Sequence, residues 1–241
     1  MSCKVALEGR LLRLTLARPE KRNALNADLC RAIIDAVEAA APADTGAIFL
    51  DAEGPSFCSG MDLGDSLVGD PAALSALHER LFTLGRRSQV PIVAYVQGHA
   101  IAGGLGLAAN AHIVIANEDA RFGLTELRVA MWPFLIYRPV EEAIGARRTL
   151  AWSLTAGVHS AAEAREAGLV HAIGNAESAQ AIARELAVRQ PDALRLGMRN
   201  YRESRGLNHA ESGALAGKLR AELMNATAYA QAVHDFRDKK I

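Results

Sequence analysis

The stretch QGHAIAGG, residues 97–104, lies inside a segment without Asp, Glu, Lys or Arg that runs from Ser88 to Asn117. The apolar run Pro91 to Val96 before it predicts a buried strand, and Gly103 to Asn110 predicts a buried helix. The uncharged segment exceeds the ~20 residues of a membrane helix, but proline, glycine, Asn and His residues interrupt it. We therefore expect a strand, a glycine loop and a helix in a folded core, and no membrane segment.

Strand and helix patterns alternate on both sides of this stretch. We expect strands at Leu11–Leu16, Ala47–Asp51 and His112–Ala116, and helices at Ala27–Ala40 and Pro71–Arg87. This alternation predicts a layered α/β arrangement. From about Pro191 the pattern is helical only, which predicts a core at residues 1–190 and a C-terminal helical region at residues 191–241.

Composition excludes several classes of protein. Half of the 241 residues are apolar, and the 27 basic residues balance the 27 acidic ones, so nothing draws the chain toward nucleic acid. Three scattered cysteines, Cys3, Cys30 and Cys58, argue against a disulfide framework and for a reducing, cytoplasmic location. No His/Cys cluster suggests a metal site, and residues 1–10 lack the apolar core of a signal peptide.

Three stretches, each expected as a loop after a strand, carry the candidate chemistry: PSFCSGMDL at 55–63, QGHAIAGG at 97–104 and RFGLTEL at 121–127. Gly103 and Gly104 let a ligand approach the backbone at a helix start, where free N–H groups favour negative charge. A second donor from Gly60-Met61 would complete a hole for an oxyanion. Besides Asp62, which we expect to cap a turn, Glu126 is the carboxylate available as a base.

These stretches resemble the enoyl-CoA hydratase/isomerase (crotonase) superfamily over roughly residues 10 to 175. RPEKRNAL at 18–25 is similar to the family's RPxxxNAL turn, and FCSGMDL at 57–63 to its FxxGxDL loop. Residues 97–107 resemble its strand–glycine–helix segment, FGLTE at 122–126 its FGxxE segment, and SAAEAREAGLV at 160–170 the family's segment at that place. Each motif alone is weak, but their order and spacing make the match specific.

The resemblance implies a spiral of ββα units, an acyl-CoA substrate, and trimers or hexamers assembled by C-terminal helices. Coenzyme A would enter as part of the thioester substrate, with no covalently bound cofactor. The backbone N–H groups of Met61 and Gly103 would form the oxyanion hole, and Glu126 matches the second of two glutamates in the hydratases. Gly106 occupies the position of the first glutamate, a departure that leaves one base.

The resemblance also suggests contacts for the rest of the substrate. Coenzyme A contacts would come from Lys21, Arg22, Ala24, Gly60 and Gly104, although the two charges are equally typical of a solvated turn. At residues 131–134 the chain has MWPF where the family commonly has Pro-Gly-Ala-Gly-Gly. The bulky side chains of Trp132 and Phe134 would therefore line or shorten the acyl pocket.

The sequence favours a single-base enoyl-CoA isomerase and leaves three alternatives: a hydratase that uses Glu126 alone, a non-catalytic acyl-CoA binder and an NAD-dependent oxidoreductase. The last rests on GLGLAA at 104–109, which fits the GxGxxA dinucleotide pattern. In that fold the glycines directly follow the first strand, whereas here residues 97–102 intervene in a later unit. The acyl chain, the pathway and the choice of trimer or hexamer stay open.

Overall fold

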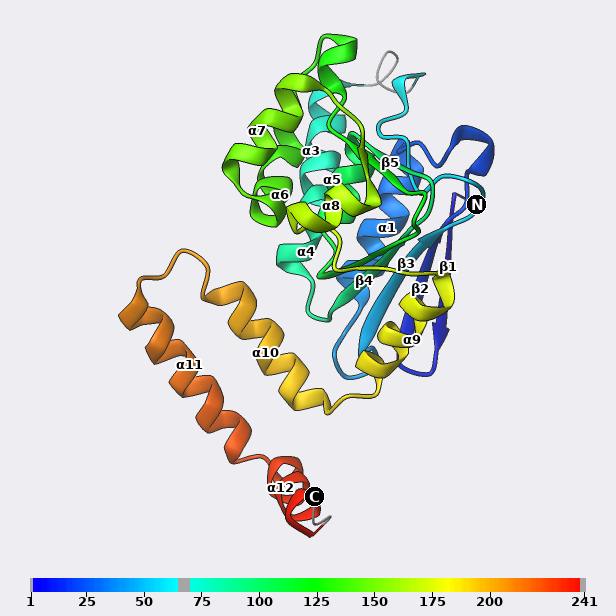
Figure 1. Ribbon diagram of the computed structural model, residues 1–241. Helices are drawn as coiled ribbons and strands as arrows, with labels where there is room; N and C mark the ends of the chain where they lie inside the picture. The colour runs from blue at the N-terminus through cyan, green and yellow to red at the C-terminus, as the bar shows by residue number, and fades with distance from the viewer. Residues whose placement is uncertain (1, 65–69, 239–241) are drawn as a thin grey trace.

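The computed structural model describes residues 2–64 and 70–238 and contains two sheets (Figure 1). The larger has the strand order β1-β2-β3-β4-β6-β9, in which only β1 and β2 pair antiparallel. Its strands are β1 (Cys3–Glu8), β2 (Leu11–Leu16), β3 (Ala47–Ala52), β4 (Ile92–Val96), β6 (Ile113–Ala116) and β9 (Ala172–Ile173). The smaller sheet has the order β5-β7-β8 and consists of β5 (His99–Ile101), β7 (Arg121–Gly123) and β8 (His159–Ser160).

Successive segments of the chain give one strand to each sheet and then a helix. Strand β4 joins the larger sheet, β5 the smaller one, and α5 (Gly103–Ala109) follows. Strands β6 and β7 repeat this pattern before the short helix η2 (Glu126–Val129), α6 (Phe134–Ile144) and α7 (Ala146–Thr155). Strands β8 and β9 flank α8 (Ala161–Ala167). The α/β expectation and the repeated ββα unit are confirmed.

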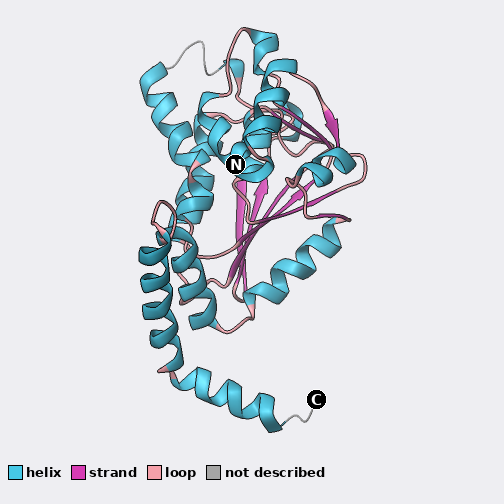
Figure 2. Cartoon of the chain, turned by 60° about the vertical axis from the view of Figure 1, so that its left-hand side comes forward, coloured by secondary structure: helices cyan, strands magenta, loops and turns pink. Residues whose placement is uncertain are grey.

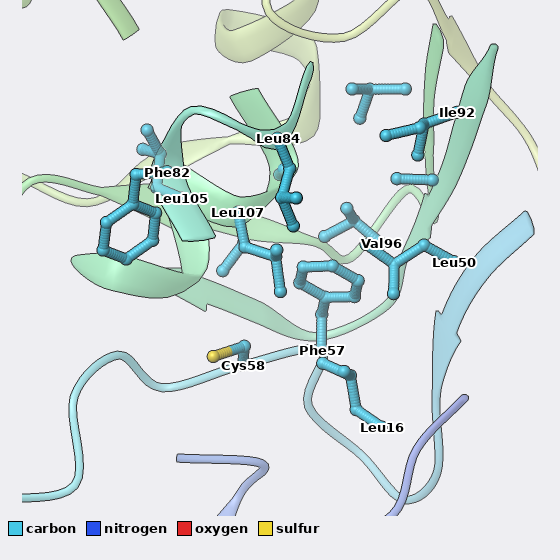
Figure 3. Close-up of a cluster of buried hydrophobic side chains, with 14 of the residues drawn as sticks. Leu16, Leu50, Phe57, Cys58, Phe82, Leu84, Ile92, Val96, Leu105 and Leu107 are labelled. Carbon is cyan, nitrogen blue, oxygen red and sulfur yellow. The ribbon is translucent and has the colours of Figure 1, made fainter. Parts of the chain in front are cut away.

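The central parallel strands of the larger sheet, such as β3 and β4, are buried on both faces, as parallel sheets require. Alternation along β3 sends Ile48 and Leu50 to one face and Ala47 and Phe49 to the other. The first face packs with α1 (Ala27–Ala39), α3 (Pro71–Phe82) and α4 (Leu84–Arg87), and Figure 3 shows Phe57 among the leucines and valine there. The second face is covered by alanines of α9 (Ala176–Ala187). In Figure 1, helix α9 lies away from α1, α3 and α5.

Several local expectations differ from the structure. Strand β1 was not expected, although Cys3, Val5 and Leu7 alternate with Lys4 and Ala6; in the structure only Cys3 of its six residues is buried. The helix expected at residues 71–87 is broken at Thr83, whose hydroxyl donates to the Glu79 carbonyl oxygen at 2.8 Å. Strands β5 and β7 lie within stretches expected to be loops, because three residues are too few to show a period.

The C-terminal region is helical from Pro191, as expected. Helices α10 (Pro191–Glu203), α11 (His209–Met224) and α12 (Thr227–Asp238) carry only two buried residues among those described, Leu196 and Leu219. Figures 1 and 2 show α11 and α12 running away from the strands. The domain boundary at residue 190 stays a prediction. Among the described helices, none combines the length and apolar character needed to cross a membrane.

Candidate active site

Two loops bring a pair of backbone N–H groups together. Gly103 is the first residue of α5, a position whose N–H has no acceptor within a helix. Residues Gly60 and Gly103 are close neighbours, since a Cβ placed on Gly60 would lie 3.4 Å from the Gly103 nitrogen. Gly60 has φ +97°, a left-handed backbone that favours glycine. The turn at Gly60 therefore allows the close approach of residues 60–61 to the start of α5.

The N–H of Met61 is free because of local strand pairing. The Leu25 N–H donates to the Gly60 carbonyl oxygen at 2.8 Å, and the Asp62 N–H donates to the Leu25 carbonyl oxygen at 3.0 Å. Since N–H directions alternate along an extended chain, the Met61 N–H points away from Leu25. Within residues 2–64 and 70–238, neither this N–H nor that of Gly103 has an acceptor. Both residues line a cavity of about 670 Å³.

Glu126 lies in the wall of this cavity at the start of η2. Its side chain is buried, with 8% of the residue exposed, and its Oε2 has no hydrogen-bond partner in the described part of the chain. Burial raises the pKa of this carboxyl to about 7, because an apolar surrounding disfavours the charged form. A carboxyl that titrates near neutrality can both remove and return a proton at physiological pH.

Gly106 leaves no room for a second carboxylate. A Cβ at Gly106 would overlap the Ile136 side chain of α6 and would lie 3.3 Å from Cδ1 of Phe82. Apolar side chains therefore fill the space that a larger residue would need. Among the described residues that line the cavity, Glu126 is the only acid.

The cavity wall is mostly apolar. Trp132 and Phe134 both line it. Trp132 stacks on Tyr137 with 6.1 Å between ring centroids, and Phe134 is 76% exposed at the surface. A stripe of α3 forms another wall: Pro71, Leu74, Ser75, His78 and Phe82. Such a lining suits an aliphatic chain better than a charged ligand.

The predicted coenzyme A contacts lie outside this cavity lining. Lys21 and Arg22 are exposed, on a turn tied to the Met61 loop by a 3.0 Å hydrogen bond from the Ser59 N–H to the Arg22 carbonyl oxygen. Arg18 reinforces the connection, since it binds the Ala24 carbonyl oxygen at 2.5 Å and Asp62 at 3.1 Å. Asp62 also accepts from the Gly64 N–H at 3.1 Å, which confirms the expected turn cap.

Gly104 serves close packing. A Cβ there would overlap the Cys58 carbonyl oxygen, so the glycine lets α5 approach the backbone of residues 58–60. The glycines of GLGLAA lie in α5, which follows β4 and β5, and not directly after the first strand of the fold as the dinucleotide fingerprint requires. This overturns the basis for the oxidoreductase alternative.

Among the cavity residues that sequence reasoning missed is His78 of the α3 wall. Its spacing from Leu74, Leu81 and Phe82 marks the inward face of a helix, which was the available signal. Cys58 is buried and burial raises the pKa of its thiol to about 12, so it cannot serve as a nucleophile near neutrality. Across the described residues, no group of three or more His, Cys, Asp or Glu side chains could hold a metal ion.

Two free backbone donors beside a buried carboxyl and an apolar cavity form a site suited to stabilising an oxyanion on a ligand with an aliphatic part. The family model described as enoyl-CoA hydratase/isomerase matches residues 7–240. This chain therefore belongs to the enoyl-CoA hydratase/isomerase (crotonase) family.

Relatives and solved structures agree with this assignment. "Probable enoyl-CoA hydratase echA6" of Mycobacterium bovis is 32% identical over 204 residues, which cover 83% of this chain and 82% of the relative. The 2,3-dehydroadipyl-CoA hydratase of Escherichia coli is 32% identical over 213 residues, 83% of this chain and 81% of the relative. An enoyl-CoA hydratase structure from Mycobacterium smegmatis superposes with a TM-score of 0.93 at 23% identity, over 99% of this chain and 97% of the other. The expected crotonase fold is confirmed.

Proposed function

We propose that this chain is an enoyl-CoA isomerase that uses Glu126 as its single base and the N–H groups of Met61 and Gly103 as its oxyanion hole. The observation that carries the proposal is the contrast between positions 126 and 106. Position 126 holds a buried carboxyl with a pKa of about 7, whereas position 106 is a glycine covered by the Ile136 side chain.

Shifting a double bond needs one group that moves one proton. The thioester carbonyl of a 3-enoyl-CoA accepts hydrogen bonds from Met61 and Gly103, and the Glu126 carboxylate removes a proton from C2. The electron pair delocalises over C2 to C4 and the thioester oxygen as a dienolate, which the two donors stabilise. Glu126 then returns the proton to C4, and the double bond lies between C2 and C3.

Hydration requires more functional groups than isomerisation, because a water must be oriented, deprotonated and added while a proton reaches C2. Gly106 offers no side chain for that water. The names of the M. bovis and E. coli relatives nevertheless favour a hydratase as the second candidate, with Glu126 acting alone. A non-catalytic acyl-CoA binder is the third candidate, and turnover of a panel of enoyl-CoA esters separates it from both enzymes.

We expect coenzyme A and short acyl-CoA esters to raise the melting temperature of the chain. A ligand that binds only the folded state stabilises it by about 2.7 kcal/mol at a hundredfold excess over Kd. If Lys21 and Arg22 bind the phosphates, replacing both with Ala reduces the shift. Arg31→Ala is the matched control, because Arg31 is an exposed cation of α1 paired with Asp28. Absence of any shift at millimolar concentration would contradict acyl-CoA binding.

We also propose that the chain forms a homotrimer or hexamer through the helices after Pro191. The leucines Leu215, Leu219 and Leu223, spaced four residues apart on α11, do not supply this surface, because Leu219 is buried and α11 packs on α10. The exposed large apolar residues described in this region are Tyr201, Leu207, Met224, Tyr229, Val233 and Phe236. Light scattering should give a trimeric or hexameric mass for the full chain and a smaller assembly after truncation at Gln190. An unchanged assembly in the truncated chain would refute this.

A further inference from the structure

His78 is an unpartnered polar side chain in the wall of the acyl cavity. It projects from the cavity-facing stripe of α3 and is 6% exposed. Its Nε2 has no hydrogen-bond partner in the described part of the chain. Burial lowers the pKa of the imidazole, so the ring is neutral near pH 7. Its neighbour is the Phe82 ring, with centroids 5.8 Å apart.

A buried imidazole nitrogen without a hydrogen-bond partner lowers the stability of the folded chain unless a ligand pairs with it. A buried polar atom with no partner destabilises a fold, and nearly all such atoms in proteins are paired. A neutral imidazole has one N–H donor and one acceptor nitrogen. It therefore matches an uncharged oxygen group, a hydroxyl or a carbonyl, better than it matches a methylene chain.

The position of His78 places this group along the acyl chain and not at the thioester. Phe82 borders the oxyanion hole, since a Cβ on Gly103 would lie 3.3 Å from its Cζ. His78 is one helical turn away, about 5.4 Å along the axis of α3. Ser75, Leu74 and Pro71 continue the same wall beyond it. A ligand atom that meets His78 therefore lies about one helical turn along this wall from the atoms held at the Gly103 N–H.

We propose that His78 hydrogen-bonds a hydroxyl or carbonyl oxygen carried by the acyl chain, so the preferred substrates are oxygenated acyl-CoA thioesters. This inference rests on the proposed acyl-CoA function of the site. It assigns His78 a part in substrate specificity, while proton transfer stays with Glu126.

Calorimetric binding of matched saturated esters tests the inference without turnover. The pairs are butanoyl-CoA with 4-hydroxybutanoyl-CoA, hexanoyl-CoA with 6-hydroxyhexanoyl-CoA, and octanoyl-CoA with 8-hydroxyoctanoyl-CoA. In the native chain, the hydroxylated member of at least one pair should bind about tenfold more tightly, as expected for one buried hydrogen bond. His78→Leu should abolish that preference, and His78→Gln should retain part of it. His209→Leu, at an exposed histidine of α11, should leave it unchanged.

The unliganded variants give a second readout. Removing an unpartnered buried nitrogen should leave the melting temperature of His78→Leu equal to or above that of the native chain. Its failure to fold would make His78 a core residue and overturn the inference. Equal binding of both members of every pair by the native chain would also overturn it and leave the proposed function standing. Absence of binding by every ester would overturn the proposed function together with the inference.

Discussion

Glu126→Gln should lower kcat for conversion of a 3-enoyl-CoA to a 2-enoyl-CoA by about 10²–10⁴, the usual worth of a positioned acid–base group. Glutamine has nearly the shape of glutamate but cannot accept the C2 proton. The rise in absorbance of the conjugated thioester measures the reaction. Glu118→Gln, which changes an exposed carboxylate near β6, is the matched control and should retain native activity.

The pH profile separates this role from a structural one. Because burial raises the pKa of Glu126 to about 7, the carboxylate that acts as base is present above that pH and lost below it. In the native chain, kcat/KM should therefore rise with pH through a midpoint near 7, which reports the free enzyme. The residual activity of Glu126→Gln should lack this rise. Full isomerase activity in this variant would exclude Glu126 as the base.

Gly103→Pro should lower kcat by about 10²–10³, because proline has no N–H and one oxyanion donor disappears. Proline is tolerated at the first position of a helix, where Gly103 stands. The variant should therefore be measured for folding by circular dichroism and for coenzyme A binding, and both should persist.

Gly103→Ala is the matched control, since it adds a Cβ and keeps the N–H. That Cβ would meet the ends of two movable side chains, Leu25 Cδ1 at 3.1 Å and Phe82 Cζ at 3.3 Å, so small shifts accommodate it. It should be far more active than Gly103→Pro. Near-native turnover in folded Gly103→Pro would show that the oxyanion donor lies elsewhere.

The fold was predictable where apolar periodicity was long. The buried strands around Leu14, Phe49 and Ala94 and the helix capped by Asn26 were expected within a few residues of their observed bounds. The smaller sheet was not, because its strands of two or three residues carry no periodic signal. The spiral came from the family resemblance and not from the strand and helix patterns.

The candidate site was partly predictable. Glycines and an isolated glutamate marked the candidate oxyanion donors and the candidate base, because backbone donors at a helix start follow from local sequence. His78 escaped notice because a histidine on an apolar helix face resembles any core residue, and only the assembled cavity shows that its nitrogen lacks a partner. The contact between Gly106 and Ile136 joins residues distant in sequence, so no local pattern reveals it.

One-base chemistry at Glu126 is tested most directly by comparing two reactions of the native chain. Under identical conditions, kcat/KM is measured for isomerisation of 3-hexenoyl-CoA and for hydration of 2-hexenoyl-CoA. The single carboxyl and the filled space at Gly106 predict measurable isomerisation and much weaker hydration. Fast hydration with little or no isomerisation would contradict the claim and identify the chain as a hydratase that orients water by another group.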